Sequence, residues 1–435
     1  IFRDDERMNL IEDLRWRGLL AQTTDEAALV ETLKKPTTLY VGFDPTAPSL
    51  HAGNLVVLLV LRRFQLAGHN PIALVGGATG LVGDPSGKNE ERSLNSTEIV
   101  EAWVNRIRSQ VSAFLDFNAP KNPALVVNNL DWTSPLSAIE FLRDIGKHFS
   151  VNQMLSKDSV SARLEGGGIS YTEFSYQVLQ SYDFLELYRR NNCTLQVGGS
   201  DQWGNIVAGL DLIRRVEQGS GHALTVPLLM KADGTKFGKT EGGSVWLDPE
   251  KTSPYAFYQF WLNVSDEDAS KYIRIFTVLD QATIEGLEKE HAAAPHLRLL
   301  QKEIAKEVTA MVHSKKEYEM ALKASEILFG KSSTDDLASL DERTFLAVFE
   351  GVPQVQLSQA VYSNLENVLD LVAEKTDFKL FPSKGEARKM ILGGGVSINK
   401  EKVEDPQGPV SYSLLQGKYL LVQKGKKNYY LIIAE

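Results

Sequence analysis

Apolar runs alternate with amphipathic stretches along residues 37–225, which is the pattern of a parallel sheet covered by helices. We expect strands at 38–43, 72–75 and 194–197. The apolar stretch NLVVLLVLRRFQLAG between the first two predicts a helix, and Gly68 suits its C-terminal cap. Each strand leads into a turn that contains Gly or Asp, at the edge where open α/β sheets bind ligands. The first part of the chain therefore predicts an α/β fold.

The pattern changes after residue 250, where long charged and apolar helical stretches replace the strands. Residues 331–342, KSSTDDLASLDE, are polar and suggest a link. The last segment is short and contains several glycines and apolar runs, which suggests a small α+β module. The predicted domains are an α/β domain at 1–249, a helical domain at 250–330, a linker region at 331–378 and a small domain at 379–435.

Composition narrows the class of protein. The chain has 435 residues, of which 43% are hydrophobic and 24% charged, as in ordinary globular proteins. Its longest apolar run, 55–61, is far shorter than the ~18–20 residues that cross a bilayer, so we expect no membrane span and a cytoplasmic location. One cysteine, Cys193, excludes an internal disulfide and a redox pair of thiols.

Charge is unevenly distributed. The net charge is −9, yet residues 380–435 hold nine lysines and arginines against five acidic residues. This basic segment predicts either a local contact with a polyanion or a tail that is merely solvated.

Two Gly-containing turns carry candidate chemistry. In YVGFDPTAPSLHAGN, residues 40–54, His51 and Gly53 stand where the next helix begins, so backbone N–H groups and an imidazole can meet anionic oxygens. A simple capping histidine is the alternative. The second turn, GGATGLVGDPSGK, fits neither the P-loop nor the dinucleotide template, which argues against those two classes of nucleotide site. Asp84 in this turn can bind a cationic amine or simply stabilise the turn.

Three further segments place polar groups together. Tyr176, Gln180 and Asp183 share one face of a helix predicted at 172–188, either as a pocket wall or as a solvated face. GGSDQWGN follows a strand with Asp201 and Gln202, unless it is a plain turn. KADGTKFGKTEGG carries Lys236 and Lys239 on a Gly-rich loop, which can neutralise a leaving polyphosphate or be an ordinary surface hairpin.

These segments, in this order, resemble the class I aminoacyl-tRNA synthetases, and within them the bacterial tyrosyl-tRNA synthetases. HAGN stands where that family has HIGH, and KFGKT where it has KMSKS; the likeness covers residues 7–250. FPSKGEARKMILGGGVSINKEKVEDP resembles an S4-type RNA-binding module. Asn54, Phe237 and Gly238 depart from the family signatures. The resemblance implies a Rossmann-like catalytic domain, a helical domain on the anticodon side and a C-terminal α+β S4-like domain.

The resemblance also implies the site residues. The substrate tyrosine would meet Tyr40, Asp84, Tyr176, Gln180, Asp183 and Gln202. ATP would meet Gly42, Asp44, His51, Gly53, Asn54, Gly199, Asp201 and Lys239. The catalytic groups would be Thr46, His51, Lys88, Arg92, Lys236, Lys239 and Thr240. RNA phosphates would meet Lys384, Arg388, Lys389, Lys400, Lys424, Lys426 and Lys427.

The function implied is the ligation of tyrosine to tRNA(Tyr) with ATP, by a homodimer whose contact segment resembles residues 146–155. Mg²⁺ would accompany ATP, and neither a tightly bound cofactor nor a metal site on the chain is expected. The alternatives are a tryptophan-specific sibling, a small-molecule nucleotidyltransferase and a non-catalytic RNA-binding protein. Opposing Tyr40 and Asp183 suit a phenol and favour tyrosine.

Overall fold

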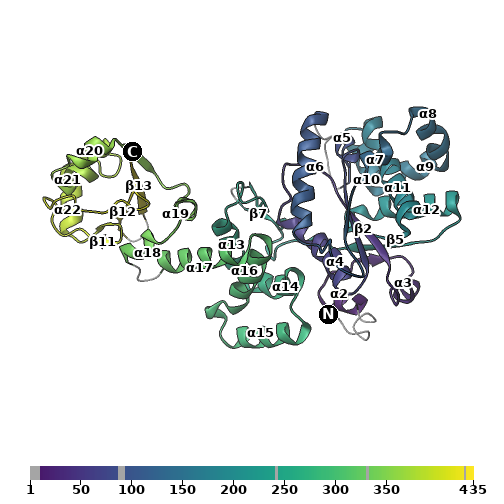
Figure 1. Ribbon diagram of the computed structural model, residues 1–435, viewed down its shortest axis with the longest axis horizontal. Helices are drawn as coiled ribbons and strands as arrows, with labels where there is room; N and C mark the ends of the chain where they lie inside the picture. The colour runs from purple at the N-terminus through teal and green to yellow at the C-terminus, as the bar shows by residue number, and fades with distance from the viewer. Residues whose placement is uncertain (1–9, 87–93, 241–242, 330–332, 426–427) are drawn as a thin grey trace. The chain divides into compact units, whose positions relative to one another are not determined.

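The computed structural model describes residues 10–86, 94–240, 243–329, 333–425 and 428–435. It consists of two compact units, which we call the N-terminal and C-terminal units (Figure 1). The N-terminal unit comprises Ile1–Thr252 and Trp261–Val312, and the C-terminal unit comprises Ser253–Phe260 and His313–Glu435. The helical segment predicted at 250–330 is therefore divided between the two units.

A six-stranded sheet forms the centre of the N-terminal unit. Its strand order is β1-β6-β5-β2-β3-β4, and every pairing is parallel except that of the short β1 with β6. The strands are β1 (Gln22–Thr23), β2 (Thr38–Phe43), β3 (Asn70–Val75), β4 (Leu125–Asn128), β5 (Cys193–Gly199) and β6 (His222–Val226). All three predicted strands are confirmed, and two of them are longer than predicted because pairing with neighbours extends them.

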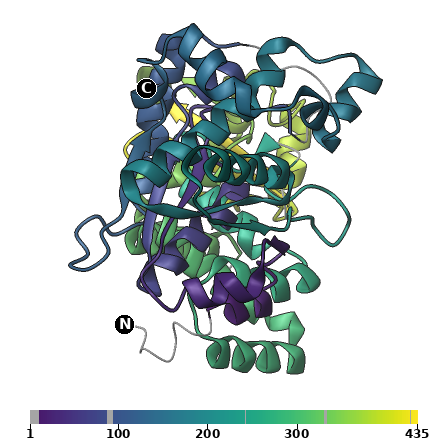
Figure 2. The ribbon, with the colours of Figure 1, turned by 90° about the vertical axis from the view of Figure 1, so that its right-hand side faces the viewer.

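Helices cover both faces of this sheet (Figures 1 and 2). The predicted apolar helix is α4 (Leu55–Leu66), and Gly68, with φ of +91°, adopts the left-handed conformation expected after a helix end. The others that accompany the sheet are α2 (Leu10–Trp16), α3 (Glu26–Thr32), α5 (Thr79–Val82), α6 (Thr97–Ser112), α7 (Leu130–Thr133), α8 (Ala138–Glu140), α9 (Val151–Leu155), α10 (Asp158–Gly166), α11 (Tyr171–Asn191) and α12 (Trp203–Glu217). No helix in the described ranges has the length and apolar character that a membrane span requires.

The chain continues through a small hairpin into a helical region. The hairpin pairs β7 (Lys239–Thr240) with β8 (Gly243–Ser244). The helices that follow are α13 (Pro254–Leu262), α14 (Asp266–Phe276), α15 (Gln281–Ala293) and α16 (Leu299–Val312). Short 3₁₀ turns are η1 (Ala52–Asn54), η3 (Gly146–His148), η4 (Ser200–Gln202), η5 (Pro295–Leu297) and η6 (Glu374–Thr376), and η2 (Phe141–Ile145) is π-helical.

Two buried arginines attach helix α14 to the sheet layer. Arg17 donates to the carbonyl oxygens of Arg274 and Leu279 at 2.9 and 2.7 Å, and Arg63 of α4 donates to that of Thr277. These carbonyls belong to the end of α14 and the turn after it, where backbone acceptors lack helical partners and the helix dipole favours cations. Burial, with Arg17 nearby, lowers the pKa of Arg63 to about 9.

The C-terminal unit is built on a five-stranded sheet with the order β11-β10-β12-β13-β9. Its helices are α17 (Lys315–Phe329), α18 (Thr334–Ala338), α19 (Glu342–Val348), α20 (Gln359–Ser363), α21 (Val368–Val372) and α22 (Lys384–Leu392). Its strands are β9 (Gln354–Leu357), β10 (Val396–Ile398), β11 (Glu401–Lys402), β12 (Tyr419–Lys424) and β13 (Asn428–Ala434). The predicted α+β module is therefore present.

The linker predicted at 331–378 is wrong as a description of this segment. Strand β9 pairs in parallel with β13, and Val355, Val368 and Leu371 are buried in the same core as Phe381 and Val422. The segment begins with a polar stretch, which suggested a link. Its apolar side chains are nevertheless buried, because they pack with side chains from much later in the chain, such as those of Val396 and Leu420.

Candidate functional site

The Gly- and Asp-bearing turns meet at one edge of the sheet. Strands β2, β3 and β5 run parallel, so Asp44, Gly76 and the turn Ser200–Gln202 follow their carboxyl ends at the same edge. The chain crosses from one side of β2 to the other, since β3 and β5 flank it. This change in strand order leaves a crevice at the carboxyl edge in doubly wound sheets, where ligands bind.

A chain of hydrogen bonds links helix α11 to the segments that follow β2, β3 and β4. The hydroxyl of Tyr176 donates to Asp44 Oδ2 at 2.6 Å, and that of Thr79 donates to Asp44 Oδ1 at 2.6 Å. Asn129 Nδ2 donates to Thr79 Oγ1 and to Asp183 Oδ2, at 2.9 and 3.0 Å. Asp44, which the sequence assigned to ATP, thus also contacts a residue of the predicted tyrosine site.

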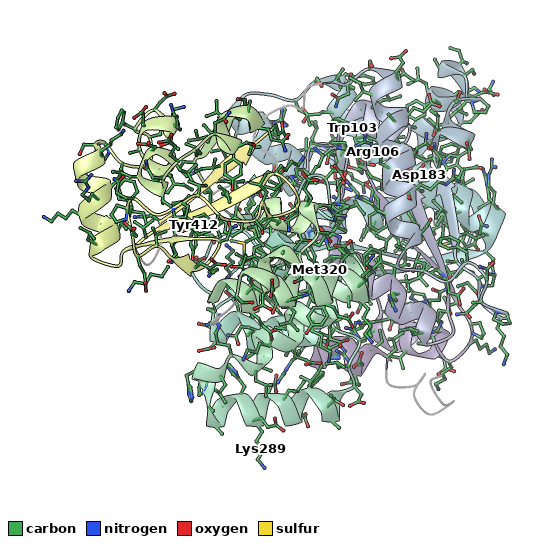
Figure 3. All side chains as sticks on the ribbon, turned by 60° about the vertical axis from the view of Figure 1, so that its left-hand side comes forward. Trp103, Arg106, Asp183, Lys289, Met320 and Tyr412 are labelled. Carbon is green, nitrogen blue, oxygen red and sulfur yellow. The ribbon has the colours of Figure 1, made fainter. Side chains whose placement is uncertain are left out.

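Tyr40 and Asp183 lie at the bottom of the site. Only 1% of Tyr40 and 3% of Asp183 is exposed, and Figure 3 labels Asp183 in the N-terminal unit. Trp132 Nε1 donates to Asp183 Oδ1 at 2.8 Å, while the hydroxyl of Tyr40 has no hydrogen-bond partner among the described residues. A buried hydroxyl is rarely left in this state. The arrangement suits a ligand that brings its own polar atom.

Burial sets the ionisation of this pair. It raises the pKa of Asp183 to about 7, although the hydrogen bonds from Asn129 and Trp132 act in the opposite direction. Burial, followed by the negative charge of Asp183, raises the pKa of Tyr40 well above its usual value. Tyr40 is therefore a neutral hydrogen-bonding group, and Asp183 can change its charge near neutral pH.

A second chain of amides joins helices α11 and α12. Gln202 Nε2 donates to Asp84 Oδ2 at 2.6 Å, and Asn205 Nδ2 donates to Gln180 Oε1 at 3.0 Å. Asn205 Nδ2 also lies 3.4 Å from Gln202 Oε1. The face of α11 that carries Tyr176, Gln180 and Asp183 is therefore buried, which excludes the alternative of a solvated face.

The HAGN turn is held by its own side chains. Gly53 N donates to His51 Nδ1 at 3.1 Å, and His51 N donates to Asn54 Oδ1 at 3.0 Å, which forms a capping box. Asn54 therefore uses its oxygen in the cap, so the amide NH₂ is the part of its side chain that can serve as a donor. A methyl group on Gly53 would lie 2.9 Å from the imidazole of His51. Glycine at this position therefore leaves room for the His51 ring.

The KFGKT segment lies directly against this turn. Gly238 has φ of +79°, and a Cβ there would approach Gly53 N to 3.2 Å. Phe237 is 8% exposed and packs on Trp261, Tyr272 and Phe276 with ring centroids 5.7, 5.0 and 5.0 Å apart. Both departures from the family signature thus have a physical basis in backbone conformation and aromatic packing.

The cationic groups of this segment face solvent. Lys236, Lys239 and Thr240 are exposed on the hairpin region, and Lys231 Nζ donates to the carbonyl of Lys239 at 3.0 Å.

A hollow of about 160 Å³ lies at the end of β2, lined by Asp44, Pro45, Thr46, Gly80, Val82, Gly83, Leu94 and Asn95. This hollow includes two of the predicted nucleotide and catalytic residues, Asp44 and Thr46.

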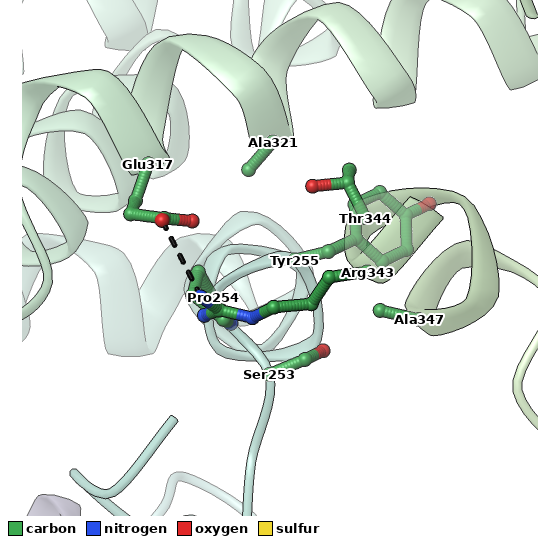
Figure 4. Close-up of a pocket in the computed structure, with 8 residues that line it drawn as sticks. All are labelled: Ser253, Pro254, Tyr255, Glu317, Ala321, Arg343, Thr344 and Ala347. Atoms are coloured by element: carbon green, nitrogen blue, oxygen red, sulfur yellow. Dashed lines mark ion pairs between the residues drawn. The ribbon is translucent and has the colours of Figure 1, made fainter. Parts of the chain in front are cut away.

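A second hollow lies within the C-terminal unit and has a different character (Figure 4). It encloses about 10 Å³, space for one water molecule. Its two charged side chains pair with each other, since Arg343 Nη1 lies 3.5 Å from Glu317 Oε1. It is too small for a substrate.

In the described part of the chain no three His, Cys, Asp or Glu side chains come together as metal ligands.

Comparison with known proteins shows the family to which the chain belongs. Residues 32–330 match the family of class I tRNA synthetases for tryptophan and tyrosine, and residues 344–432 match the C-terminal domain of SYY-like tyrosine–tRNA ligases. A tyrosine–tRNA ligase of Cytophaga hutchinsonii is 58% identical over 98% of this chain and 99% of its own length. The chain belongs to the tyrosine–tRNA ligase family. A Bacteroides fragilis ligase is 54% identical over 98% of this chain and its whole length.

Solved structures agree with this family. The truncated mitochondrial tyrosyl-tRNA synthetase of Aspergillus nidulans has a TM-score of 0.67 and 28% identity, and the alignment covers 75% of this chain and 99% of that one. The predicted fold class, a Rossmann-like catalytic domain with helices and a C-terminal α+β domain, is confirmed.

The structure brings most of the predicted site residues to the same edge of the sheet, although their roles stay predictions. Gly42 is exposed and faces open space, and Gly199 leaves room for the carboxylate of Asp201, which would lie 2.5 Å from an added Cβ. Lys88 and Arg92 lie outside the described residues.

Four residues that the sequence did not indicate complete the site, namely Thr79, Asn129, Trp132 and Asn205. Each contacts a predicted residue through a side-chain hydrogen bond. Thr79 lies in the motif GGATGLVGDPSGK and Asn205 in GGSDQWGN, so these two motifs could have indicated them. Asn129 and Trp132 follow strand β4, whose short and partly exposed sequence gave no strand signal.

The predicted RNA-binding residues differ in their surroundings. Lys384 forms ion pairs with Asp370, at 2.8 Å, and with Glu374. Lys424 lies 3.4 Å from Glu386 and over the ring of Phe381. Arg388 and Lys389 are exposed on α22, Lys400 lies over the ring of Tyr429, and Lys426 and Lys427 fall outside the described residues.

If Asp183 accepts the phenol hydroxyl of tyrosine, as the family resemblance implies, tyrosine binding should weaken as the pH falls below about 7. The carboxyl of Asp183 carries its charge only above its raised pKa of about 7, and a charged acceptor binds a phenol hydroxyl more strongly than a neutral one. We expect the dissociation constant for tyrosine to rise by up to about tenfold per pH unit below this value. Calorimetric titrations at pH 5.5 to 8.5 would measure it. The Asp183→Asn variant should bind weakly at every pH, and a flat wild-type profile would contradict the role of the carboxylate.

Proposed function

We infer that this chain activates L-tyrosine with ATP and transfers the tyrosyl group to the 3′-terminal adenosine of tRNA(Tyr). Its identity of 52–58% with tyrosine–tRNA ligases over nearly the full chain supports this activity. The observation that carries tyrosine specificity is the buried Tyr40 hydroxyl, which has no partner among the described residues and lies in the field of an Asp183 carboxyl held in place by Asn129 and Trp132. A phenol hydroxyl can both donate to the carboxylate and accept from Tyr40.

We propose that tyrosine lies with its phenol between these two residues and its α-ammonium group towards Asp84, Tyr176 and Gln180. Their side chains converge from the turn after β3 and from α11, and Gln202 adjoins Asp84. A substrate without the hydroxyl would leave the buried Tyr40 hydroxyl without a partner and would give Asp183 no hydrogen bond from the ligand, and such unmatched buried polar groups are a strong basis for rejecting an analogue.

In the first step the tyrosine carboxylate attacks the α-phosphorus of ATP. A C–O–P bond forms, the bond from the α-phosphorus to the bridging oxygen breaks, and pyrophosphate leaves with its electron pair. The carboxylate is already ionised at neutral pH, so no general base is required. We propose that His51, Thr46 and the lysines of KFGKT position ATP and neutralise the leaving group. In the second step a ribose hydroxyl of tRNA attacks the carbonyl and AMP leaves.

ATP brings Mg²⁺ on its own phosphates. We propose no residue of this chain as a ligand of that ion, because Asp44 and Asp84, two of the acidic side chains at this edge, already accept hydrogen bonds within the site. The ion would lower the charge of the polyphosphate.

For tRNA, the exposed Arg388 and Lys389 are the better candidates for phosphate contacts, since Lys384 and Lys424 already have acidic neighbours. This assignment rests on the match to the C-terminal domain of the ligases. A cytoplasmic location stays a prediction.

We propose that the protein forms a homodimer through an apolar surface on helices α8 to α11. Large side chains are exposed there to an unusual degree, and α8, α9 and α10 gather at one end of the N-terminal unit (Figure 1). They are Ile139, Leu142, Val151, Leu155, Leu164 and Tyr171. Val151 and Leu155 belong to the segment predicted from the sequence.

The Val151→Asp variant should sediment as a monomer at concentrations where the wild type is a dimer, because a charge in the apolar centre of an interface is desolvated without a partner. Val151 is 58% exposed, and Leu297, 56% exposed in η5, provides a matched control. Leu297→Asp should leave the dimer intact. A monomeric wild type, or equal dissociation by both variants, would contradict this surface.

Tyrosine-dependent exchange of labelled pyrophosphate into ATP tests the function directly. We expect exchange with tyrosine and at most traces with tryptophan or phenylalanine, followed by charging of tRNA(Tyr). Exchange that favours tryptophan would support the sibling specificity. A purified protein that binds tRNA without any exchange would instead support the non-catalytic RNA-binding alternative.

A further inference from the structure

Helix α6 reaches the HAGN turn through one glutamine. Gln110 Oε1 accepts the backbone N–H of Leu50 at 2.8 Å, and its Nε2 donates to Ser49 Oγ at 2.9 Å. Ser49 Oγ in turn donates to the carbonyl of Leu50 at 2.7 Å and accepts the backbone N–H of Asp248 at 3.2 Å. Ser49 and Leu50 are buried. One side-chain amide therefore fixes residues 49–50 and, through Ser49, residue 248.

These residues form the joint between the two signature segments. Ala52 N donates to the carbonyl of Val245 and Leu247 N to that of Leu50, at 2.8 and 2.9 Å. His51 itself pairs with Trp246, and their rings lie 6.2 Å apart. Val245 N donates to the carbonyl of Gly238 at 2.9 Å. Any movement of residues 49–50 is thus passed to His51 and to the loop that carries Lys236 and Lys239.

We propose that Gln110 is a positioning residue for the activation of tyrosine by ATP. It acts by holding the HAGN turn and the KFGKT loop in one fixed arrangement. This inference rests on the proposed function. The two side-chain hydrogen bonds of Gln110 go to residues 49 and 50, and neither of these is among the residues proposed to bind tyrosine. Without it, the N–H of Leu50 loses its acceptor in a buried place, and the turn must shift to satisfy it. A misplacement of about 1 Å near the reacting atoms can reduce a rate about a hundredfold.

The test compares Gln110→Leu with Gln65→Leu in the full chain. Gln65 is a suitable control because its amide also ties backbone segments together, donating to the carbonyls of Asp116 and Asn122 at 2.7 and 3.1 Å and accepting from Asp116 N at 2.9 Å. It is 7% exposed and none of these bonds involves either signature segment. A general loss of stability should therefore affect the control at least as much.

We expect Gln110→Leu to lower kcat for pyrophosphate exchange about ten- to a hundredfold and to raise KM for ATP, with the dissociation constant for tyrosine within about twofold of the wild type. Gln110→Glu keeps the acceptor for Leu50 N and should recover most of the loss. Gln65→Leu should change Tm but leave kcat and both substrate constants close to wild type.

Equal kinetic effects of Gln110→Leu and Gln65→Leu would overturn the inference, as would a loss of tyrosine affinity that matches the loss of kcat. Both outcomes leave the proposed function intact as long as the wild type exchanges pyrophosphate. A wild type that shows no exchange with tyrosine would overturn the proposed function and this inference with it.

Discussion

Replacing Asp183 by asparagine should lower kcat/KM for tyrosine by about 10²–10⁴, while the slow use of phenylalanine stays nearly unchanged. The carboxylate accepts from Asn129 on one oxygen and from Trp132 on the other. An asparagine must turn its NH₂ group towards one of these donors, so that donor loses its partner. The acceptor for the substrate hydroxyl is weakened at the same time.

The consequence is a collapse of amino-acid selectivity rather than a general loss of activity. Tyrosyl-tRNA synthetases are the established example of such selectivity and reject phenylalanine by about 10⁵, which is a known property of the family and no prediction of ours. The Asp183→Asn variant should lose most of that factor. Pyrophosphate exchange with tyrosine and phenylalanine as alternative substrates measures it.

Asp131→Asn is the matched control, since it removes the same charge from an exposed position on α7, next to Trp132. Its selectivity should equal that of the wild type. If Asp183→Asn still rejected phenylalanine as strongly as the wild type does, the phenol would have to bind elsewhere, and the assignment of Tyr40 and Asp183 would be wrong.

Removing either lysine of the KFGKT loop should also have a large effect, on the rate of tyrosyl-adenylate formation. We expect Lys236→Ala and Lys239→Ala each to lower kcat for tyrosyl-adenylate formation by about 10²–10³, the usual effect of losing one group that stabilises developing charge. Tyrosine affinity should not change, because both side chains are exposed on the hairpin region and neither is among the residues proposed to bind tyrosine. Single-turnover formation of the adenylate, with separate titrations of tyrosine and ATP, distinguishes these effects.

Lys289→Ala provides the comparison, since Lys289 is exposed on α15 and takes no part in the site (Figure 3). It should leave the rate unchanged. A loop variant that lost tyrosine affinity and kept its rate would contradict a role in neutralising pyrophosphate. A rate equal to the wild type in both loop variants would contradict the assignment of this loop.

The predictable part of the fold depends on local pattern. The bounds predicted for strand β2 are the observed ones, because an apolar run between polar turns can be recognised without knowing its neighbours. The sequence pattern does not predict strands β4 and β6, and it places β9 in a linker. Strand β4 is partly exposed, and β9 alternates exposed and buried positions over four residues, too short a run to separate from a loop.

The candidate site is predictable to the extent that its residues lie in motifs. Tyr176, Gln180 and Asp183 share a helix face because of the helical repeat alone, and the turns after β2, β3 and β5 follow from strand order. The partners Asn129 and Trp132 could not be predicted, since they lie more than fifty residues from Asp183 and in no motif. The ion pairs of Lys384 could not be predicted either, because its partners Asp370 and Glu374 lie in the segment that the sequence pattern assigned to a linker.

Local sequence is enough to establish the α/β class, the order of the site-bearing turns and the two signature segments, because periodicity and Gly-rich turns act within about twenty residues. Two features come instead from tertiary packing: the Tyr40 hydroxyl is left without a partner among the described residues, and Gln110 is bonded to Ser49, which also accepts from Asp248 N. Each of these depends on which buried polar atoms find partners, and that is fixed only when segments distant in the chain pack together.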